Sequence, residues 1–321
     1  MQKEKLLELL NKGLVFFNPR AANYWHSVTP CNVFNKPNKP GMYYLDFSSK
    51  ADYAQQFDSK GIPMFKYADE IPLTYHATVI CQYALGLYDC LYKTDFKDDE
   101  IRKKFITQSD WLVENKSIKN KAALWLFDYP EKSYEISPPW FSAMTQGEAI
   151  SVLCRAYLLN HDTKYLITAE EAVIPFELSV IEGGVVNKFN NIIIYEEYPA
   201  SRVTGVLNGY IFSLFGLFDL SCISKNSIAK KLFDRGIENV IKLLEFYDLG
   251  YWSRYDLFAY PFVNPASYTY HNIHIEQLKA LYILTGRNEL LEYSEKWSRQ
   301  NQKITNRIKA LINKMIYMKR K

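Results

Sequence analysis

The chain has 321 residues, of which 48% are hydrophobic, 16% aromatic and 23% charged. This composition provides a large hydrophobic core and excludes a disordered or fibrous protein. The net charge of +4 comes from a basic tail, because seven positive and no acidic residues lie in 303–321. The rest of the chain is slightly acidic, whereas a nucleic-acid-binding body needs a basic face of its own, so we expect no nucleic-acid partner.

The N-terminus and the cysteines favour a cytoplasmic protein. Glu4 and Glu8 interrupt the first apolar stretch, which a signal peptide does not allow. No apolar run approaches the roughly 20 residues of a membrane-spanning helix. The five cysteines are odd in number and never form C-x-x-C, as is typical of reduced thiols in a cytosol.

The pattern along the chain predicts three parts. Residues 1–70 are rich in proline and short extended pieces, so we expect an irregular lead-in packed on the body. Residues 71–302 show helical periodicity and form the predicted catalytic body, and 303–321 form a basic amphipathic helix. The expected helices are 73–92, 99–115, 143–160, 163–180, 206–220, 226–247, 272–285, 288–301 and 303–318.

A recurring helix-turn-helix pattern indicates how the helices are arranged. Residues 157–170 and 282–295 both show an apolar helix end, a polar turn and a charged helix start. One αα-hairpin buries a single face, so several must stack side by side. We therefore expect a mainly α fold, an α/α toroid built as an incomplete ring of hairpins. Small β-hairpins, such as one over 185–195 that turns near 189–191, are expected at its cleft.

Several polar and aromatic residues are candidates for chemistry. Glu197 and Tyr198 come at a predicted strand end, before Pro199. Strand alternation points them to opposite faces unless a bulge redirects one, and a solvated acid with a packed tyrosine is the alternative. His271 and His274 lack a third ligand fixed by sequence, so a metal is not favoured.

The usual cofactor and nucleophile motifs do not occur in the sequence. Neither a phosphate-binding glycine loop nor a G-x-S-x-G elbow is found. Nucleotide binding and acyl transfer are therefore unsupported.

A set of blocks, in order, resembles the catalytic helical domain of the D-glucuronyl C5-epimerases. The blocks are residues 140–159, 195–199, 206–220, 255–257 and 270–278, preceded by 61–63 and 75–86. The resemblance covers roughly residues 60–300 and is specific as a set. The animal members carry large β-rich regions before this domain, so the chain is similar to a reduced, bacterial-type version.

The resemblance implies a uronate C5-epimerase without an organic cofactor. It would convert D-glucuronate to L-iduronate in a heparosan-like polysaccharide, of the type found in capsules and heparan sulfate, by removing the C5 proton and returning one to the opposite face. By position, Tyr255 or Tyr270 would serve one face, and Glu197 with Tyr198 the other. Weaker candidates for lining the groove are Gln146, Tyr75 and His271, for which a packing role is an equal alternative.

One departure from the family pattern bears on the substrate. The family has an arginine directly after Tyr-Asp-Leu, where this chain has Phe258. Such an arginine would hold the uronate carboxylate through two hydrogen bonds. Arg254 and Arg202 are candidate replacements. A polysaccharide lyase is a second hypothesis, because the same residues could remove the same proton, and the departure at Phe258 keeps a third hypothesis open, a non-catalytic glycan-binding homologue.

The tail predicts an interaction surface. An apolar stripe, Ile304, Ile308, Leu311, Ile312, Met315 and Ile316, runs along the last helix, with most basic residues beside it. A basic amphipathic helix suits an anionic membrane surface. The alternatives are that the stripe closes the helical ring or contacts a second copy in a homodimer.

Overall fold

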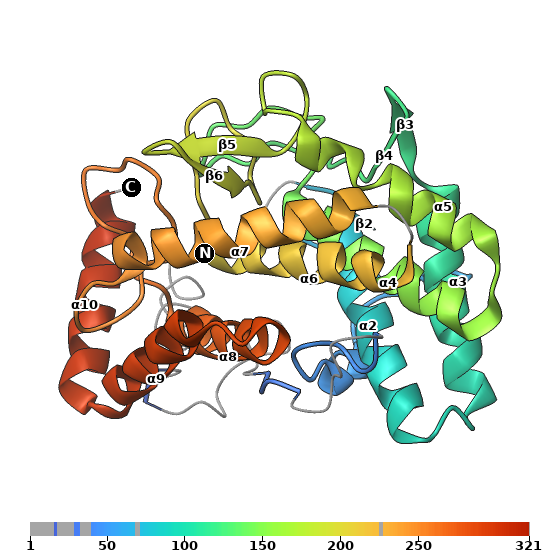
Figure 1. The fold of residues 1–321 in the computed structure, drawn as a ribbon, viewed down its shortest axis with the longest axis horizontal. Coiled ribbons are helices and arrows are strands. Elements are labelled where there is room, and N and C mark those ends of the chain that lie inside the picture. The colour runs from blue at the N-terminus through green and yellow to red at the C-terminus, as the bar shows by residue number, and fades with distance from the viewer. Residues whose placement is uncertain (1–15, 18–28, 33–39, 68–70, 225–226, 321) are drawn as a thin grey trace.

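The structure is a computed structural model that describes residues 16–17, 29–32, 40–67, 71–224 and 227–320. Helices dominate these residues, and their strands form three two-stranded sheets (Figure 1). The predicted mainly α class is confirmed. Much of the predicted lead-in 1–70 lies outside the described residues. Its described part includes a 3-10 helix, η3 (Ser48–Asp52), which packs against the first helix pair.

Four consecutive helix pairs form the body. They are α2 (Ala77–Lys93) with α3 (Asp99–Glu114), α4 (Ala143–Asn160) with α5 (Thr163–Glu171), α6 (Leu207–Ile223) with α7 (Ser227–Tyr247), and α8 (Tyr268–Thr285) with α9 (Asn288–Gln302). The first members contact one another in the order α2, α4, α6, α8. These contacts establish the order of the pairs, and the toroid itself stays a prediction.

Two residue types explain where helices begin and end. The side chain of Ser267 accepts a hydrogen bond from the Tyr270 N–H, so α8 begins four residues before the predicted position 272. The helix predicted over 163–180 is wrong beyond Glu171. Pro175 cannot continue the α-helix, because its ring would clash with the carbonyl group four residues earlier. A short 3-10 helix, η4 (Ile174–Glu177), replaces the last predicted turns.

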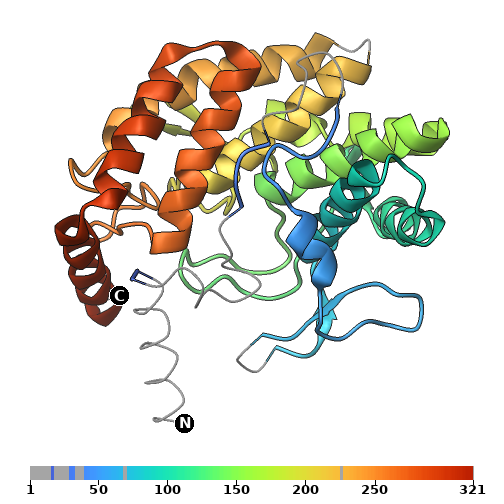
Figure 2. The ribbon, with the colours of Figure 1, turned by 90° about the horizontal axis from the view of Figure 1, so that it is seen from below.

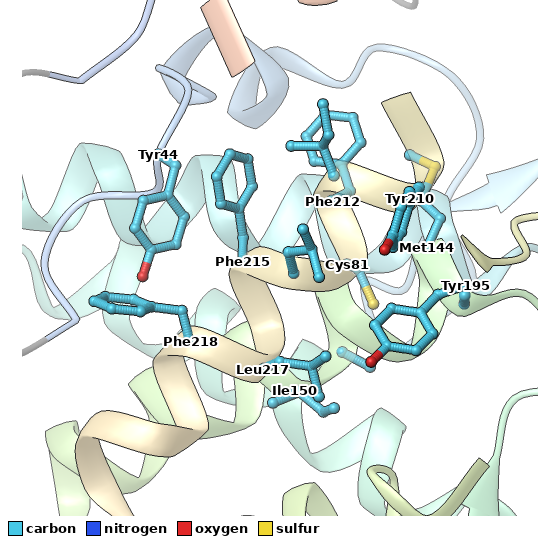
Figure 3. Packing of buried hydrophobic residues seen from close by; sticks show 14 of the residues in the cluster. Tyr44, Cys81, Met144, Ile150, Tyr195, Tyr210, Phe212, Phe215, Leu217 and Phe218 are labelled. Carbon is cyan, nitrogen blue, oxygen red and sulfur yellow. The ribbon is translucent and has the colours of Figure 1, made fainter. Parts of the chain in front are cut away.

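The core centres on the contact between α4 and α6. A Cβ on Gly147 would lie 2.4 Å from the Cα of Ser213, and one on Gly216 would lie 2.1 Å from the carbonyl oxygen of Gly147. Only glycine permits this approach. Figure 3 shows the aromatic packing around α6, to which Tyr44 contributes a ring stacked on Phe215 with centroids 4.4 Å apart.

The hairpin predicted over 185–195 is confirmed. Strands β5 (Val186–Phe189) and β6 (Ile192–Tyr195) pair antiparallel, and Asn190 and Asn191 turn the chain with φ of 48° and 65°. Asparagine tolerates this left-handed backbone. A second hairpin, β3 (Ser117–Lys119) with β4 (Ala122–Leu124), was not predicted because its strands are too short for a visible alternation. The third sheet joins β1 (Met64–Phe65) to β2 (Thr74–Tyr75).

The last helix, α10 (Ile304–Arg320), packs on α9 at the edge of the body (Figures 1 and 2). It buries Ala310 and Tyr317, whereas Ile304, Ile308 and Ile312 are 53%, 43% and 51% exposed. Most of the apolar stripe is therefore exposed, whereas Leu311 packs against the cluster that contains Trp252 and Tyr268. Within the described residues, no helix is long and apolar enough to cross a bilayer.

Candidate active site

A pocket of about 410 Å³ lies where the N-terminal ends of the inner helices meet. His76 and Ser142 directly precede α2 and α4, and Asn208 and Tyr270 lie in the first turns of α6 and α8. The other lining residues are Thr29, Phe47, Lys50, Phe65, Tyr67, Thr78, Val79, Gln82, Phe127, Tyr129, Glu131, Trp140, Met144, Glu197, Tyr198, Phe212 and Ile273. The positive ends of four helix dipoles favour a bound anion there, and the acids of the described lining are Glu131 and Glu197.

Glu197 and Tyr198 both line this pocket, although strand alternation would separate them. Strand β6 ends at Tyr195, so the alternation stops before these residues. The neighbouring Glu196 fixes the chain that follows. Its carboxylate accepts hydrogen bonds from the backbone N–H groups of Thr204 and Gly205 at 3.0 and 2.9 Å. Glu196 is thus structural, and Glu197 is a buried pocket acid.

The environment of Glu197 keeps its carboxyl group protonated near neutral pH. The residue is 7% exposed, and its Oε2 has no hydrogen-bond partner among the described residues. Burial raises its pKa to about 8, the nearby acids Glu131 and Glu196 act in the same direction, and a hydrogen bond with Tyr198 opposes them. Such a carboxyl is a stronger base than an ordinary one once it ionises.

Tyr270 presents a phenol to the same pocket, with Tyr255 beside it. The two rings meet edge to face, with centroids 4.9 Å apart, and only Tyr270 is among the lining residues. Burial and Glu197 raise the pKa of Tyr270 to about 12, and a hydrogen bond with Tyr255 opposes this. Burial also raises the pKa values of Tyr198 and Tyr255 well above 10. All three phenols therefore keep their protons at neutral pH and are available as acids.

The structure brings neither Arg254 nor Arg202 into the described lining of the pocket. Both meet Phe258 instead. Arg254 donates from Nη2 to the Phe258 carbonyl at 3.2 Å. The Arg202 guanidinium lies 4.6 Å from the Phe258 ring centroid and pairs with Glu135 at 3.0 Å. The expectation that one of them takes the place of the family arginine does not match these positions.

Gln146, Tyr75 and His271 also lie outside the described lining. Gln146 is fully buried and donates hydrogen bonds to two backbone carbonyls at 2.8 and 3.3 Å. The Tyr75 hydroxyl donates to Asp58 at 2.9 Å on the surface. His271 stacks on Trp252 with ring centroids 3.6 Å apart. All three therefore have partners outside the described lining, and their part in binding stays a prediction.

Polar residues at or beside the site that were not predicted include Lys50, Gln82 and Glu148. Lys50 lines the pocket although it is only 3% exposed. Burial lowers its pKa to about 8, against the attraction of Glu148. Gln82 lines the pocket too and donates to Glu148 at 3.1 Å. An acid inside the apolar pattern of 143–160 was a usable signal for Glu148, whereas nothing in the local sequence distinguishes Lys50.

Comparisons with known proteins match the region that holds most of these residues. The family model described as D-glucuronyl C5-epimerase C-terminus matches residues 119–299. The chain is similar to a D-glucuronyl C5-epimerase of Caenorhabditis elegans, with 34% identity over 212 residues, 60% of this chain and 34% of the relative. It is also 28% identical over 197 residues to an uncharacterized protein of Methanocaldococcus jannaschii. This match covers 60% of this chain and 63% of that protein. The chain therefore spans about a third of the first relative and less than two thirds of the second.

Proposed function

The chain belongs to the D-glucuronyl C5-epimerase family, and from this premise we propose that it is a polysaccharide uronate C5-epimerase. The observation that carries the proposal is the pairing, in one pocket, of a buried carboxyl group on Glu197 with a protonated phenol on Tyr270. An epimerase needs one group that takes the C5 proton and another that returns a proton to the opposite face. Glu197 and Tyr270 have the two properties required.

We assign the steps to these side chains as follows. In its ionised form, Glu197 removes the C5 hydrogen as a proton, and the electron pair of the C–H bond moves into the substrate carboxylate to form an enolate. The Tyr270 phenol then donates its proton to C5 from the other face. Tyr198 hydrogen-bonds to the Glu197 carboxyl and Tyr255 to the Tyr270 oxygen, so each positions one partner. A final proton exchange returns both groups to their starting states.

The pocket also suits the charge that develops in this reaction. A carbon acid beside a carboxylate is weak, so the enolate must be stabilised electrostatically. The N-terminal turns of α2, α4, α6 and α8 lie at the pocket, so the positive ends of four helix dipoles are near it. These partial charges favour the enolate more than the starting uronate, because the enolate carries more negative charge.

The walls of the pocket fit a sugar chain. Aromatic rings from Tyr67, Phe127, Tyr129 and Trp140 lie side by side, with neighbouring centroids 4.6 to 5.6 Å apart. Flat apolar rings with polar edges pack against the faces of pyranose sugars and hydrogen-bond their hydroxyls. We propose a glucuronate-containing, heparosan-like glycan as the substrate and L-iduronate as the product.

Proton NMR in deuterium oxide tests the proposal. The protein is incubated with an unsulfated heparosan-type polymer, and wild type is compared with Tyr270→Phe. We expect loss of the C5 proton signal and new iduronate resonances with wild type, and no iduronate resonances with the variant. Iduronate formation at equal rates in the two proteins would contradict the assignment of Tyr270, and no exchange in wild type would contradict the epimerase.

The ultraviolet absorbance of the same incubations separates the two alternative hypotheses. A lyase removes the same proton but expels the 4-linked sugar, so its product has a C4–C5 double bond and absorbs ultraviolet light. A non-catalytic glycan-binding protein would bind the polymer without exchange or new absorbance.

A further inference from the structure

We propose that Lys50 binds the carboxylate of the uronate in the pocket. This inference deepens the proposed function and rests on it. Lys50 lies outside the residues 119–299 that match the family model, so the assignment comes from the position of the side chain in this structure.

Lys50 is held firmly at the pocket by its backbone. It lies on η3, which packs against α2. The segment that leads into η3 is tied down by Asp89 of α2, whose carboxylate accepts the backbone N–H groups of Tyr43 and Phe47 at 2.6 and 2.9 Å. A buried residue on such a support is pre-organised, because little freedom is lost when a ligand binds.

The charges around the pocket leave this role to Lys50. Of the described lining residues, Lys50 and His76 are the basic ones, and burial lowers the pKa of His76 to about 4, so His76 is neutral. The arginines expected from the sequence lie at Phe258. A uronate carboxylate entering the pocket therefore meets a single lysine as its cation within the described lining.

Binding of a carboxylate also resolves the cost of burying this lysine. Burial lowers the pKa of Lys50 to about 8, and its attraction to Glu148 opposes this only in part. Burial raises the pKa of Glu148 well above its usual range, so Glu148 is a weak counter-ion. A substrate carboxylate adds a negative charge beside this lysine, and the same contact stabilises the enolate oxygens during the reaction.

The test compares two ligands, one with the uronate carboxylate and one in which it is reduced to a neutral hydroxymethyl group. Calorimetry measures the affinity of wild type and Lys50→Gln for a glucuronate oligosaccharide and for its carboxyl-reduced, neutral counterpart. We expect wild type to prefer the uronate by about 10- to 100-fold, as for a hydrogen bond to a charged group. Lys50→Gln should lose this preference and keep its affinity for the neutral ligand. An unchanged preference in Lys50→Gln would overturn the inference.

Further variants keep the test decisive. Lys50→Met replaces Lys50→Gln if the latter does not fold, because an apolar side chain suits a buried site. Lys50→Arg should retain the preference, and Lys60→Gln on the exposed turn is the matched control. Binding does not require turnover, so a Lys50-dependent preference without C5 exchange would overturn the epimerase but not the carboxylate site.

A separate observation carries a second inference. We infer that the outward face of α10 docks on an anionic lipid surface. Ile304, Ile308, Ile312 and Met315 are 43% to 53% exposed, and their spacing of four, four and three residues places them on one stripe. Lys309 and Lys319 of α10 and the preceding Lys303 are exposed, and 303–321 contain no acid. An apolar stripe with basic flanks matches the acyl boundary and the anionic headgroups together.

Sedimentation with vesicles tests this second inference. Deleting the tail is unsuitable, because Lys314 donates to Asn264 at 2.6 Å and lies 5.5 Å from the Tyr255 ring centroid. The double variant Ile308→Ser/Ile312→Ser removes the stripe alone, and Ile181→Ser, at a 97% exposed position, is the control. We expect wild type and the control to sediment with phosphatidylglycerol vesicles and the double variant to stay free. Absence of sedimentation, or a wild-type dimer that the double variant dissociates, would overturn the inference.

Discussion

Gly209 leaves the space that the Glu197 side chain occupies. A Cβ on Gly209 would lie 2.1 Å from Glu197 Oε2 and 2.5 Å from its Cβ. The carboxyl group of Glu197 therefore packs directly on the first turn of α6, near the positive end of that helix. The position of the proposed base therefore depends on a glycine, which has no side chain, at the third residue of α6.

Gly209→Ala should lower the rate of C5 exchange by about 100-fold, because displacement of a reacting group by about 1 Å has effects of this size. Alanine favours a helix over glycine by about 1 kcal/mol, which offsets part of the clash in the free energy of unfolding. Exchange into deuterium oxide measures the rate. Gly236→Ala is the control, since its Cβ would meet a core Leu214 methyl at 2.3 Å. The control should lower Tm and retain activity, and full activity in Gly209→Ala would refute the dependence.

The pH dependence of kcat/KM should show the ionisation of Glu197. The base is its carboxylate form, which is populated above a pKa of about 8, so kcat/KM should fall about tenfold for each pH unit below 8. The proton of Lys50, with a pKa of about 8, is lost on the alkaline side. Lys50→Arg should therefore flatten the alkaline limb and leave the acidic limb in place. A profile without an acidic limb would exclude Glu197 as the base.

Glu197→Gln should abolish exchange and yet stabilise the fold at alkaline pH. The folded pKa of about 8 lies above the ordinary value of 4.5, so the folded state holds the proton more tightly than the unfolded state. The stability that this proton provides is present at low pH and is lost as pH rises to about 8. The gain in Tm from Glu197→Gln should be small near pH 5 and correspond to a few kcal/mol near pH 8. Glu114→Gln, at an exposed position, is the control, and a gain independent of pH would argue against a raised pKa.

The helical body could be predicted because local rules determine it. Periodicity located the helix pairs, and the Asn190-Asn191 turn placed β5 and β6. The end of α5 at Glu171 was predicted wrongly, because the apolar pattern continues to residue 180 although Pro175 cannot lie inside the helix.

The candidate site was only partly visible in the sequence for a different reason. Glu197, Tyr198 and Tyr270 belong to blocks that resemble the family, and they share the pocket. Lys50 reaches the pocket through tertiary packing of η3 on α2, which no local pattern encodes. Conversely, Gln146 has a polar side chain of the type found in binding sites, but its amide group donates hydrogen bonds to backbone carbonyls in the core.

Tyr270→Phe should lower the rate of iduronate formation more than Tyr255→Phe. Tyr270 faces the pocket, and loss of a proton donor in the transition state lowers the rate by about 100- to 10,000-fold. Tyr255 contacts the Tyr270 ring and is not among the described lining residues. Tyr255→Phe should therefore lose only the positioning of Tyr270, and its rate should fall about tenfold. Single-turnover formation of iduronate, followed by NMR, measures the rate of both variants. Equal losses would indicate that both phenols transfer protons, and a larger loss for Tyr255→Phe would reverse the assignment.

Arg254→Ala should lower activity more than Arg235→Ala. Arg254 precedes Tyr255 and holds the chain beyond it through its bond to the Phe258 carbonyl at 3.2 Å. Its loss should loosen the support of Tyr255 and reduce kcat about tenfold with little change in KM, because the side chain does not line the pocket. Arg235 donates to Tyr195 and to the Phe176 carbonyl on the other side of the hairpin, so its variant should lose stability and keep kcat within about twofold. A rise in KM for Arg254→Ala without a change in kcat would instead mean that Arg254 binds the uronate itself.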